Sequence, residues 1–263
     1  MKPFIQPVFP TELRCLVIGH RGAAAVRPEN TLVSFRAAQE AGASMIELDV
    51  QQSTDGELFV FHDDTLERLC RAPYAVAELS WSELASHTVG RWNQERLAIP
   101  RLAEVFLTFQ RSLLYNIELK TDTVPYPGIE QRLVELVRAQ KLAERVLVSS
   151  FHHDSLRIVR ELDPHLTLGL LLSLEQGCHL GSPEAMVARA QEFSCFSLHP
   201  DFRLLRLYPA VVEQCHTAGL RVFPWTVDHP HIWHVLVEEL GVDGIITNDP
   251  GKLYEWLLGE HAA

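Results

Sequence analysis

The chain has 263 residues, of which 47% are hydrophobic, so it can form one large domain or two small ones around a substantial core. Its formal net charge of -11 and the absence of a basic stripe argue against a nucleic-acid-binding protein, and an acidic surface does not attract anionic membranes. If the substrate is an anion, the binding site itself must supply local positive charge.

The N-terminal segment, MKPFIQPVFPTELR, has one lysine and early prolines but no apolar core of the kind that signal peptides contain. No run is long enough for a transmembrane helix. The five cysteines are irregularly spaced and include no C-x-x-C pair: Cys15, Cys70, Cys178, Cys195 and Cys215. Such a set is typical of reduced thiols and not of a disulfide framework or a zinc site. We therefore expect a cytoplasmic protein without stable membrane association.

Strand-like and helix-like segments alternate along the chain. Strands are predicted over residues 13–20, 45–51, 57–63, 113–120, 145–151, 166–172, 195–200, 220–227 and 243–249. Helices are predicted between them over Asn30–Ala41, Ile129–Gln140, Asp154–Leu162, Pro183–Phe193, Pro209–Ala218 and His231–Leu240. This alternation indicates parallel pairing and an α/β fold, and roughly eight units match the size of a (β/α)8 TIM barrel. A doubly wound sheet is less consistent, because GHRGAAA after the first strand lacks the G-x-G-x-x-G phosphate loop.

One strand is in excess of eight, and a hairpin accounts for it. Asp55-Gly56 between two β-rich runs is a strong hairpin signal, and too few residues are present for a parallel crossover. The turn would return His62 to the level of Asp49. The stretch after it, at about 64–112, mixes polar turns with one short helix predicted at Trp81–His87. We interpret it as a small insertion in a single barrel domain that spans residues 1–263.

Carboxylates lie on two of the predicted strands. Glu47 and Asp49 are two residues apart, so their side chains point to the same face. Glu118 lies near the end of another strand, and the C-terminal ends of barrel strands form the active-site face. Three converging carboxylates without cysteine indicate a site for a hard cation, Mg2+ or Ca2+. The alternative is an ion-paired barrel interior, but unpaired buried carboxylates are costly.

Histidines and basic residues lie at the same strand ends. His20 and His62 are candidates for proton transfer, because the ordinary pKa of histidine, about 6.5, allows one ring to act as a base and another as an acid near neutral pH. Arg21 and Lys120 could hold an anionic oxygen, although salt bridges to the neighbouring carboxylates are the alternative, above all for Lys120. A cation, two histidines and two basic side chains together describe a site for a phosphate ester.

The order of these motifs resembles the glycerophosphodiester phosphodiesterase family. The matching stretches are GHRG, PENTLVSFRAAQEAG, IELDVQQSTDGELFVFHD, IPRLAEV, NIELK, VLVSSF and FPWTVD, which run from Ile18 to about Asp249. The joint match is specific, although no single motif would be, and it is closest to compact cytosolic bacterial members. The resemblance implies a (β/α)8 barrel that hydrolyses glycerophosphodiesters to sn-glycerol 3-phosphate and an alcohol.

The resemblance also implies roles for individual residues. The general acid–base pair falls on His20 and His62. The phosphate-contacting residues fall on Arg21 and Lys120. The ligands of one divalent cation, Mg2+ or Ca2+, fall on Glu47, Asp49 and Glu118.

Four further residues are candidates for supporting roles. Trp225 matches an aromatic residue near the mouth of the family's barrel and could pack on the glycerol carbons, or it could be a core tryptophan. His199 ends a predicted strand and is a secondary candidate for contact with the substrate. Asn30 could cap the first helix, and Glu29 could hold Arg21.

The remaining histidines are interpreted as structural. His152 and His153 follow a strand and precede Asp154, which we expect to cap the next helix. A second group is spaced like metal ligands but lies at a helix start with no carboxylate nearby, and we expect it to be solvated: His229, His231 and His234.

Two different kinds of protein, and one different substrate, are the rivals of this prediction. A metal-dependent amidohydrolase barrel would need H-x-H at the first strand, and Gly19-His20-Arg21 does not supply it. A non-catalytic binding barrel would be favoured by loss of a histidine or carboxylate, and none is missing. Hydrolysis of lysophospholipid-type phosphodiesters on the same barrel is the alternative activity. The head group, the preferred cation and the oligomeric state are left open by the sequence.

Overall fold

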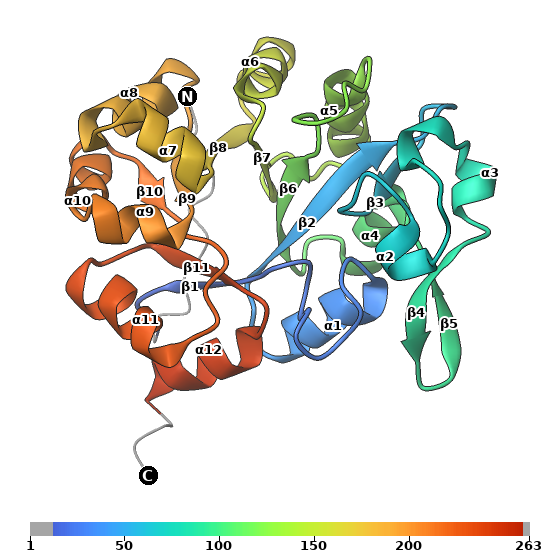
Figure 1. Cartoon of the computed structure of the whole chain (residues 1–263), viewed down its shortest axis with the longest axis horizontal. Coiled ribbons are helices and arrows are strands. Elements are labelled where there is room, and N and C mark those ends of the chain that lie inside the picture. The colour runs from blue at the N-terminus through green and yellow to red at the C-terminus, as the bar shows by residue number, and fades with distance from the viewer. Residues whose placement is uncertain (1–12, 260–263) are drawn as a thin grey trace.

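The computed structural model describes residues 13–259, and its centre is a nearly closed barrel of eight parallel strands (Figure 1). Their order around the barrel is β10-β9-β8-β7-β6-β2-β1-β11. The strands are β1 (Leu16–Gly19), β2 (Met45–Gln52), β6 (Leu114–Leu119), β7 (Val146–Ser150), β8 (Thr167–Leu172), β9 (Ser197–Pro200), β10 (Arg221–Val222) and β11 (Gly244–Thr247). A backbone hydrogen bond from Asp243 N to Val222 O (3.1 Å) helps to span the gap between β10 and β11. The predicted (β/α)8 barrel is confirmed.

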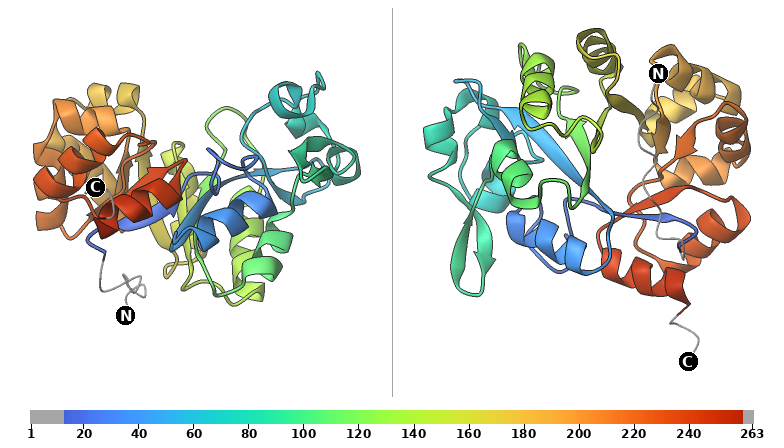
Figure 2. Two further views of the ribbon diagram at one scale, coloured as in Figure 1. Left: turned by 90° about the horizontal axis from the view of Figure 1, so that it is seen from below. Right: turned by 180° about the vertical axis from the view of Figure 1, so that it is seen from behind.

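Helices surround the strands on the outside of the barrel (Figures 1 and 2). They are α1 (Leu32–Glu40), α4 (Leu102–Phe109), α5 (Ile129–Ala139), α6 (His153–Leu162), α7 (Leu174–Leu180), α8 (Pro183–Glu192), α9 (Phe202–Leu207), α10 (Ala210–Thr217), α11 (Pro230–His234), the π-helical turn η2 (Val235–Glu239) and α12 (Pro250–Leu258). All six predicted helices are present with slightly shifted ends. Helices α4, α7, α9 and α12 were not among the predicted helices, and two of them are short, with seven residues in α7 and six in α9.

The start of α1 corrects one prediction. Its N-cap is Thr31, whose Oγ1 accepts a hydrogen bond from Ser34 N (3.2 Å). The prediction that Asn30 caps this helix is therefore wrong. Asn30 has a positive φ of 56° and instead donates its side-chain N–H to Asp49 Oδ2 (2.8 Å). A polar residue that the local pattern favoured as a cap thus faces the barrel.

Inward-facing side chains form two layers. The lower layer is an apolar cluster made of Leu16, Ile18, Met45, Leu114, Leu147, Phe223 and Ile246. Because alternate residues of a strand share a face, Met45 is followed inside the barrel by Glu47, and Leu114 by Asn116. The polar side chains therefore lie above an apolar floor, at the C-terminal ends of the strands, where barrel enzymes carry their active sites.

The predicted hairpin is present after β2. Strand β3 (Leu58–Val60) pairs antiparallel with β2, with Val50 opposite Val60. Gly56 in the turn has a φ of +88°, a conformation that glycine adopts without steric cost. Phe61 N donates to Asp49 O (3.0 Å), which returns the following residue, His62, to the level predicted for it.

The stretch predicted as an insertion has its own small core. It contains α2 (Glu67–Cys70), η1 (Val76–Glu78), α3 (Trp81–Leu84), β4 (Thr88–Trp92) and β5 (Glu95–Ala98). Its buried residues, from Phe59 to Ile99, form a cluster separate from the main core, and the β4–β5 hairpin projects from the barrel (Figure 1). Helix α4, by contrast, packs into the main core. The interpretation of the whole chain as one domain stays a prediction.

The cysteines, the membrane-spanning potential of the helices and the N-terminal segment were also subjects of prediction. The five cysteines are all free, and Cys15, Cys195 and Cys215 are buried. None of the helices within residues 13–259 has the length and hydropathy needed to cross a bilayer. The predicted lack of a signal peptide concerns a segment that lies almost wholly outside the described residues.

Candidate active site

A pocket of about 260 Å3 opens at the C-terminal ends of the barrel strands. It is lined by His20, Arg21, Glu47, His62, Asn116, Glu118, Lys120, Ser149, Phe151, Leu171, Trp225, Thr226 and Ile246. Most of the residues predicted for the site are among them, although they come from distant parts of the chain. Asp49 lies behind this wall beside the other two carboxylates, and His199 is not part of the wall.

Strand register brings the three predicted metal ligands together. In the β2–β6 pair, Asp49 is the partner of Glu118, and Glu47 lies one inward-facing position earlier on β2. One oxygen of each carboxylate lies within 4.8 Å of the other two, and all three side chains are almost fully buried. Oxygen atoms at such spacing suit a hard divalent cation.

Two of these carboxylates have a cationic partner and the third does not. Lys120 Nζ is 2.9 Å from Glu118 Oε1, and Arg21 Nε is 3.3 Å from Asp49 Oδ2. Glu47 Oε2 accepts the backbone N–H of Arg21 (3.0 Å), but its buried Oε1 has no hydrogen-bond partner within residues 13–259. Burial, and then the charges of Asp49 and Glu118, raise the pKa of Glu47 well above its ordinary value. The cluster therefore fits a cation that neutralises it.

The other two carboxylates respond differently to the same burial. Burial raises the pKa of Glu118 to about 7, although Lys120 opposes the shift. Burial also disfavours the charge on Asp49, but Arg21, followed by His62 and Lys120, holds the pKa of Asp49 below its ordinary value. The alternative of an ion-paired interior thus describes Asp49 and Glu118 in part, and leaves Glu47 unexplained.

His20 follows β1, and a residue from the far end of the chain fixes its ring. Its Nδ1 is 2.7 Å from Asn248 Oδ1, and Asn248 Nδ2 donates to Asp228 Oδ2 (2.7 Å). Because Asp228 accepts that amide N–H, the amide oxygen faces His20, so Nδ1 carries the ring hydrogen. Nε2 remains an acceptor, 4.0 Å from Glu47 Oε2. Burial, and then Arg21, lower the pKa of His20 to about 4, so the ring is neutral at pH 7.

His62 has a charged partner instead. Its Nδ1 is 2.7 Å from Asp63 Oδ1, and its side chain is about one-third exposed. Arg68 donates to both oxygens of Asp63 (2.6 and 2.9 Å). Burial opposes ionisation of Asp63, but the hydrogen bonds from Arg68 and His62 lower its pKa to about 2. The carboxylate that faces His62 is thus fixed and negatively charged.

The basic residues are held by carboxylates at the rim. Arg21 has a φ of 51° and donates from one terminal nitrogen to Glu29 Oε1 (2.8 Å), as predicted. Arg68 binds the same Glu29 through two hydrogen bonds (2.6 and 2.9 Å). Lys120 is 13% exposed in its side chain and forms the ion pair that was the alternative interpretation. Both Arg21 and Lys120 nevertheless line the pocket.

An aromatic wall closes the opposite side. Trp225 stacks edge-to-face on Phe151, with 5.3 Å between ring centroids, and both line the pocket. Trp225 Nε1 donates to the backbone oxygen of His199 (2.9 Å), which fixes the indole. The His199 side chain is fully buried and its Nε2 is 2.7 Å from Ser197 Oγ. The structure therefore places His199 behind the wall as a support, which does not fit the predicted contact with the substrate.

The two other groups of histidines lie outside the pocket. His152 is the N-cap residue of α6 and Asp154 lies in its first turn, so the prediction that Asp154 caps this helix is wrong. His153 Nε2 donates to Leu171 O (2.9 Å) on the barrel rim. Exposed histidines begin α11, as expected for a solvated helix start: His229, His231 and His234.

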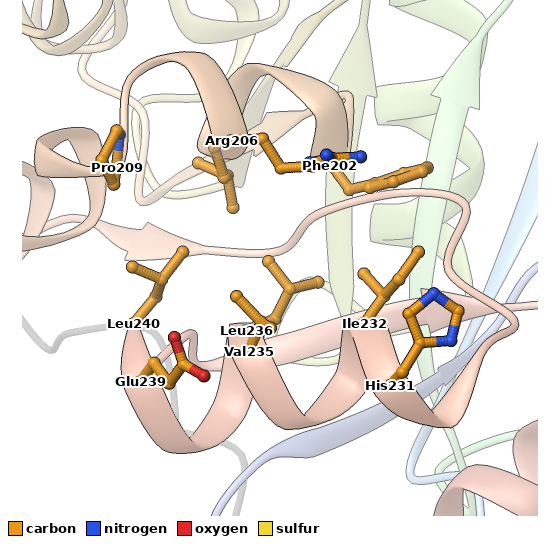
Figure 3. A pocket seen from close by; sticks show the side chains of 10 residues that line it. Phe202, Arg206, Pro209, His231, Ile232, Val235, Leu236, Glu239 and Leu240 are labelled. Carbon is orange, nitrogen blue, oxygen red and sulfur yellow. The ribbon is translucent and has the colours of Figure 1, made fainter.

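A larger cavity of about 510 Å3 lies elsewhere, between α9 and the helix formed by α11 and η2 (Figure 3). Ile232, Leu236 and Leu240 lie on one side of it, with Phe202 opposite Ile232 and Pro209 opposite Leu240. Three polar side chains, those of Arg206, His231 and Glu239, lie among its lining residues. Within residues 13–259, only the acidic cluster at the barrel mouth brings three or more histidine, cysteine or carboxylate side chains close enough to share a metal ion. The smaller pocket is therefore the candidate active site.

Several residues of this site were not predicted from the sequence. Ser149 lies on β7 and Phe151 follows that strand. Asn248 follows β11, and its partner Asp228 lies 20 residues earlier in the sequence. No local pattern links these positions. Asn116 could have been found, because it lies two residues before Glu118 and therefore on the same face of the strand.

Fold and site together define a class of protein. A (β/α)8 barrel with buried carboxylates, two oriented histidines and basic side chains at its mouth is an enzyme scaffold suited to a phosphate ester.

Comparison with known proteins gives the family. Residues 20–252 match the model of the glycerophosphoryl diester phosphodiesterase family. A glycerophosphodiester phosphodiesterase of Caldanaerobacter subterraneus subsp. tengcongensis is 41% identical over 245 residues, covering 92% of this chain and 97% of that protein. The corresponding enzyme of Bacillus altitudinis is 35% identical, covering 90% and 95%.

Solved structures agree with the sequence relatives. A phosphodiesterase from Oleispira antarctica, solved with the product sn-glycerol-3-phosphate, has a TM-score of 0.77 and 25% identity, covering 93% of this chain and 96% of its own. A putative glycerophosphoryl diester phosphodiesterase from Silicibacter pomeroyi has a TM-score of 0.83 and 26% identity, covering 94% and 93%. This chain belongs to the glycerophosphoryl diester phosphodiesterase family. The predicted family and the prediction of an enzyme of this type are confirmed.

Proposed function

We propose that this protein hydrolyses glycerophosphodiesters to sn-glycerol 3-phosphate and an alcohol, with a divalent cation and a histidine acid–base pair. Family membership supports the reaction. The observation that carries the finer proposal is the convergence of Glu47, Asp49 and Glu118 beside two histidines whose rings are held by different partners.

The cation is proposed to be Mg2+ or Ca2+, held by the three carboxylates. When bound, it would supply positive charge to the oxygens of the phosphodiester. The buried Oε1 of Glu47, which has no hydrogen-bond partner among the described residues, supports this assignment. Arg21 and Lys120 are proposed to contact the phosphate, because they line the same pocket and keep their charge at neutral pH.

His20 is proposed as the general base. Its Nδ1 hydrogen is directed to Asn248, so Nε2 offers a lone pair, and its pKa of about 4 keeps that lone pair free at neutral pH. It would take a proton from the nucleophile, which is either water or the glycerol 2-hydroxyl that first forms a cyclic phosphate.

His62 is proposed as the general acid. Asp63 holds the ring at Nδ1, which leaves Nε2 to give a proton to the leaving alcohol. The base and the acid are assigned on the different ring partners, a neutral amide for His20 and a carboxylate for His62.

The proposed setting of the reaction follows the chemistry of the chain. Free cysteines and an acidic net charge support a cytoplasmic protein that binds a small molecule and not nucleic acid. A pocket of about 260 Å3 is slightly smaller than the roughly 300 Å3 lower limit for drug-sized ligands, which favours a glycerol group inside it. Lysophospholipids, whose chain would remain outside, are the second candidate substrates.

The test is an assay of the metal-stripped enzyme on glycerophosphocholine, glycerophosphoethanolamine and a lysophospholipid, with Mg2+ or Ca2+ added back. We expect activity on the first two substrates that depends on the added cation. His20→Ala and His62→Ala should each lower turnover at least ~100-fold, the usual scale for general acid–base catalysis. His152→Ala, at an exposed histidine outside the pocket, is the control and should retain activity. Near-normal turnover in either active-site variant would refute the acid–base assignment.

A further inference from the structure

Asn116 is a buried amide in the pocket wall with half of its hydrogen-bonding capacity unused. It lies on β6, two residues before Glu118, and is 1% exposed. Its Oδ1 accepts a hydrogen bond from Ser149 Oγ (2.8 Å), while its Nδ2 has no hydrogen-bond partner within residues 13–259. A buried N–H without an acceptor destabilises the folded protein, so a ligand that supplies an acceptor removes this cost and binds more tightly.

The orientation of this amide follows from its neighbours. Asn116 is the register partner of Glu47, so both side chains point into the barrel at one level. A reversed amide would turn its oxygen toward the acidic side of the pocket. The observed orientation gives Oδ1 the hydrogen bond from Ser149 Oγ and, among the described residues, leaves Nδ2 available for a ligand.

Asn116 and Ser149 together present a donor and an acceptor. Nδ2 offers a hydrogen, and Ser149 Oγ, whose own hydrogen is used by Asn116, keeps lone pairs that can accept one. An alcohol group both accepts and donates, so it can use the two sites at once. A phosphate oxygen in a diester only accepts, and the cationic side chains at the rim are better suited to it.

The surroundings also favour a small polyol over an anion. The apolar residues Leu171 and Ile246 and the edge-to-face pair of Phe151 and Trp225 line the same pocket. Apolar walls with a few placed polar groups are typical of a pocket that binds the carbon skeleton and hydroxyls of a ligand.

We propose that Asn116 is a specificity-determining residue, which together with Ser149 binds a hydroxyl of the substrate's glycerol group. This inference rests on the proposed function and adds the part of the site that recognises glycerol itself. Its consequence is selective: Asn116 matters for substrates that carry glycerol and not for phosphodiesters that lack it.

The experiment compares two substrates in matched variants. Glycerophosphocholine carries glycerol, and bis(p-nitrophenyl) phosphate does not. Asn116→Ala and Asn116→Leu, which roughly keeps the volume but removes the donor without adding charge, should lower kcat/KM for glycerophosphocholine about 10- to 100-fold, the scale of a buried hydrogen bond. The same variants should hydrolyse bis(p-nitrophenyl) phosphate at close to the wild-type rate. Ser149→Ala should show the same selectivity, because it frees the amide to turn.

A second amide provides the control. Asn30 Nδ2 donates to Asp49, a carboxylate of the acidic cluster, so Asn30→Ala should weaken Ca2+ binding in a calorimetric titration and impair both substrates. Asn116→Ala should leave Ca2+ binding and the melting temperature near wild type. Equal losses on both substrates, a loss of Ca2+ affinity in the Asn116 variants, or unchanged kinetics on glycerophosphocholine would each overturn the inference.

The activity of the wild type distinguishes a failure of this inference from a failure of the proposed function. If the wild type cleaves bis(p-nitrophenyl) phosphate but no glycerophosphodiester, the proposed function fails and the inference fails with it. If the wild type cleaves glycerophosphocholine and the Asn116 variants do so equally well, only the inference fails.

Discussion

The two halves of the pocket wall are built from different kinds of residue. Strands β1, β2 and β6 and the end of the β3 hairpin contribute the charged and titratable side chains: His20, Arg21, Glu47, His62, Glu118 and Lys120. The lining residues that the structure describes on the other half are uncharged: Ser149, Phe151, Leu171, Trp225, Thr226 and Ile246. One half has the groups that can move protons and hold ions, and the other half has the shape and hydroxyls that can recognise a substrate.

The comparison also concerns how each half is stabilised. On the charged half, Glu47 and Glu118 have raised pKa values mainly because they are buried, so a bound cation would stabilise this half. The uncharged half is packed without a ligand. A Cβ on Gly169 would lie 2.6 Å from His199 Nε2, so only glycine leaves room for that ring, and His199 in turn holds Trp225. Changes in the first half should affect chemistry, and changes in the second should affect binding or stability.

The largest effect is expected on the charged half. Glu47→Gln removes one proposed metal ligand and should lower kcat/KM by about 1,000-fold, since a metal contributes several kcal/mol of charge stabilisation. It also removes a buried charge beside Asp49 and Glu118, so the metal-free variant should melt at a higher temperature than the wild type. Kinetics and thermal unfolding measure these two effects, and a Ca2+ titration measures the accompanying loss of cation affinity. An active variant with unchanged Ca2+ affinity would rule out Glu47 as a ligand.

A smaller effect is expected on the uncharged half. Trp225→Leu removes the face that packs on Phe151 and lines the pocket. If this wall only binds substrate, KM for glycerophosphocholine should rise about 10-fold while kcat stays close to wild type. A large drop in kcat at unchanged KM would mean that the division between the two halves is incorrect.

The third prediction changes the pH dependence without removing activity. In the double variant Asp228→Asn, Asn248→Asp, the amide at 228 can donate to the carboxylate at 248, which still accepts the Nδ1 hydrogen of His20. The exchange moves the negative charge from position 228 to position 248, next to His20, where it favours the protonated ring and raises the pKa of His20. The acid limb of the kcat/KM profile should therefore move to higher pH by about one unit or more. An unmoved limb in an active double variant would show that His20 is not the group that titrates.

The smallest effect on activity is expected at His199. Burial lowers its pKa to about 3, so the folded protein keeps it neutral, whereas the unfolded chain protonates it below about 6.5. Its contribution to the free energy of unfolding is complete above pH 6.5 and is lost as the pH falls toward 3. Between pH 6.5 and 4.5 the wild type should lose about 2 kcal/mol more than His199→Gln. Denaturant unfolding at the two pH values tests this, and parallel losses would contradict it.

Much of the fold was predictable because its signals are local. Short β-branched or apolar runs located all nine predicted strands, and Asp55-Gly56 correctly indicated the hairpin. The helix starts were less predictable, since Asn30 and Asp154 are both good caps by residue type but have other partners or positions in the structure. Helix α4 was taken for part of the insertion, which was predicted to extend to about residue 112, although Pro100 marks a boundary just before the helix.

The site divides in the same way. Glu47, Asp49 and Glu118 were predictable as neighbours, because residues two apart on a strand share a face and barrel strands end at one rim. The partners that distinguish the histidines were less predictable. Asn248 contacts His20 across 228 positions of sequence, and only barrel closure brings β11 beside β1.

The sequence by itself determined the barrel, the acidic cluster, the two histidines and the family, because each depends on periodicity or on short motifs. The tertiary structure decided which histidine has a neutral partner. Among the described residues it also gave Glu47, alone of the three carboxylates, no cationic side-chain partner, and left the Asn116 N–H in the pocket wall without an acceptor. These features depend on strand register and on distances of a few ångströms between segments far apart in the chain. Hydrogen bonding and burial, which set the chemistry of each group, exist only once those segments are packed together.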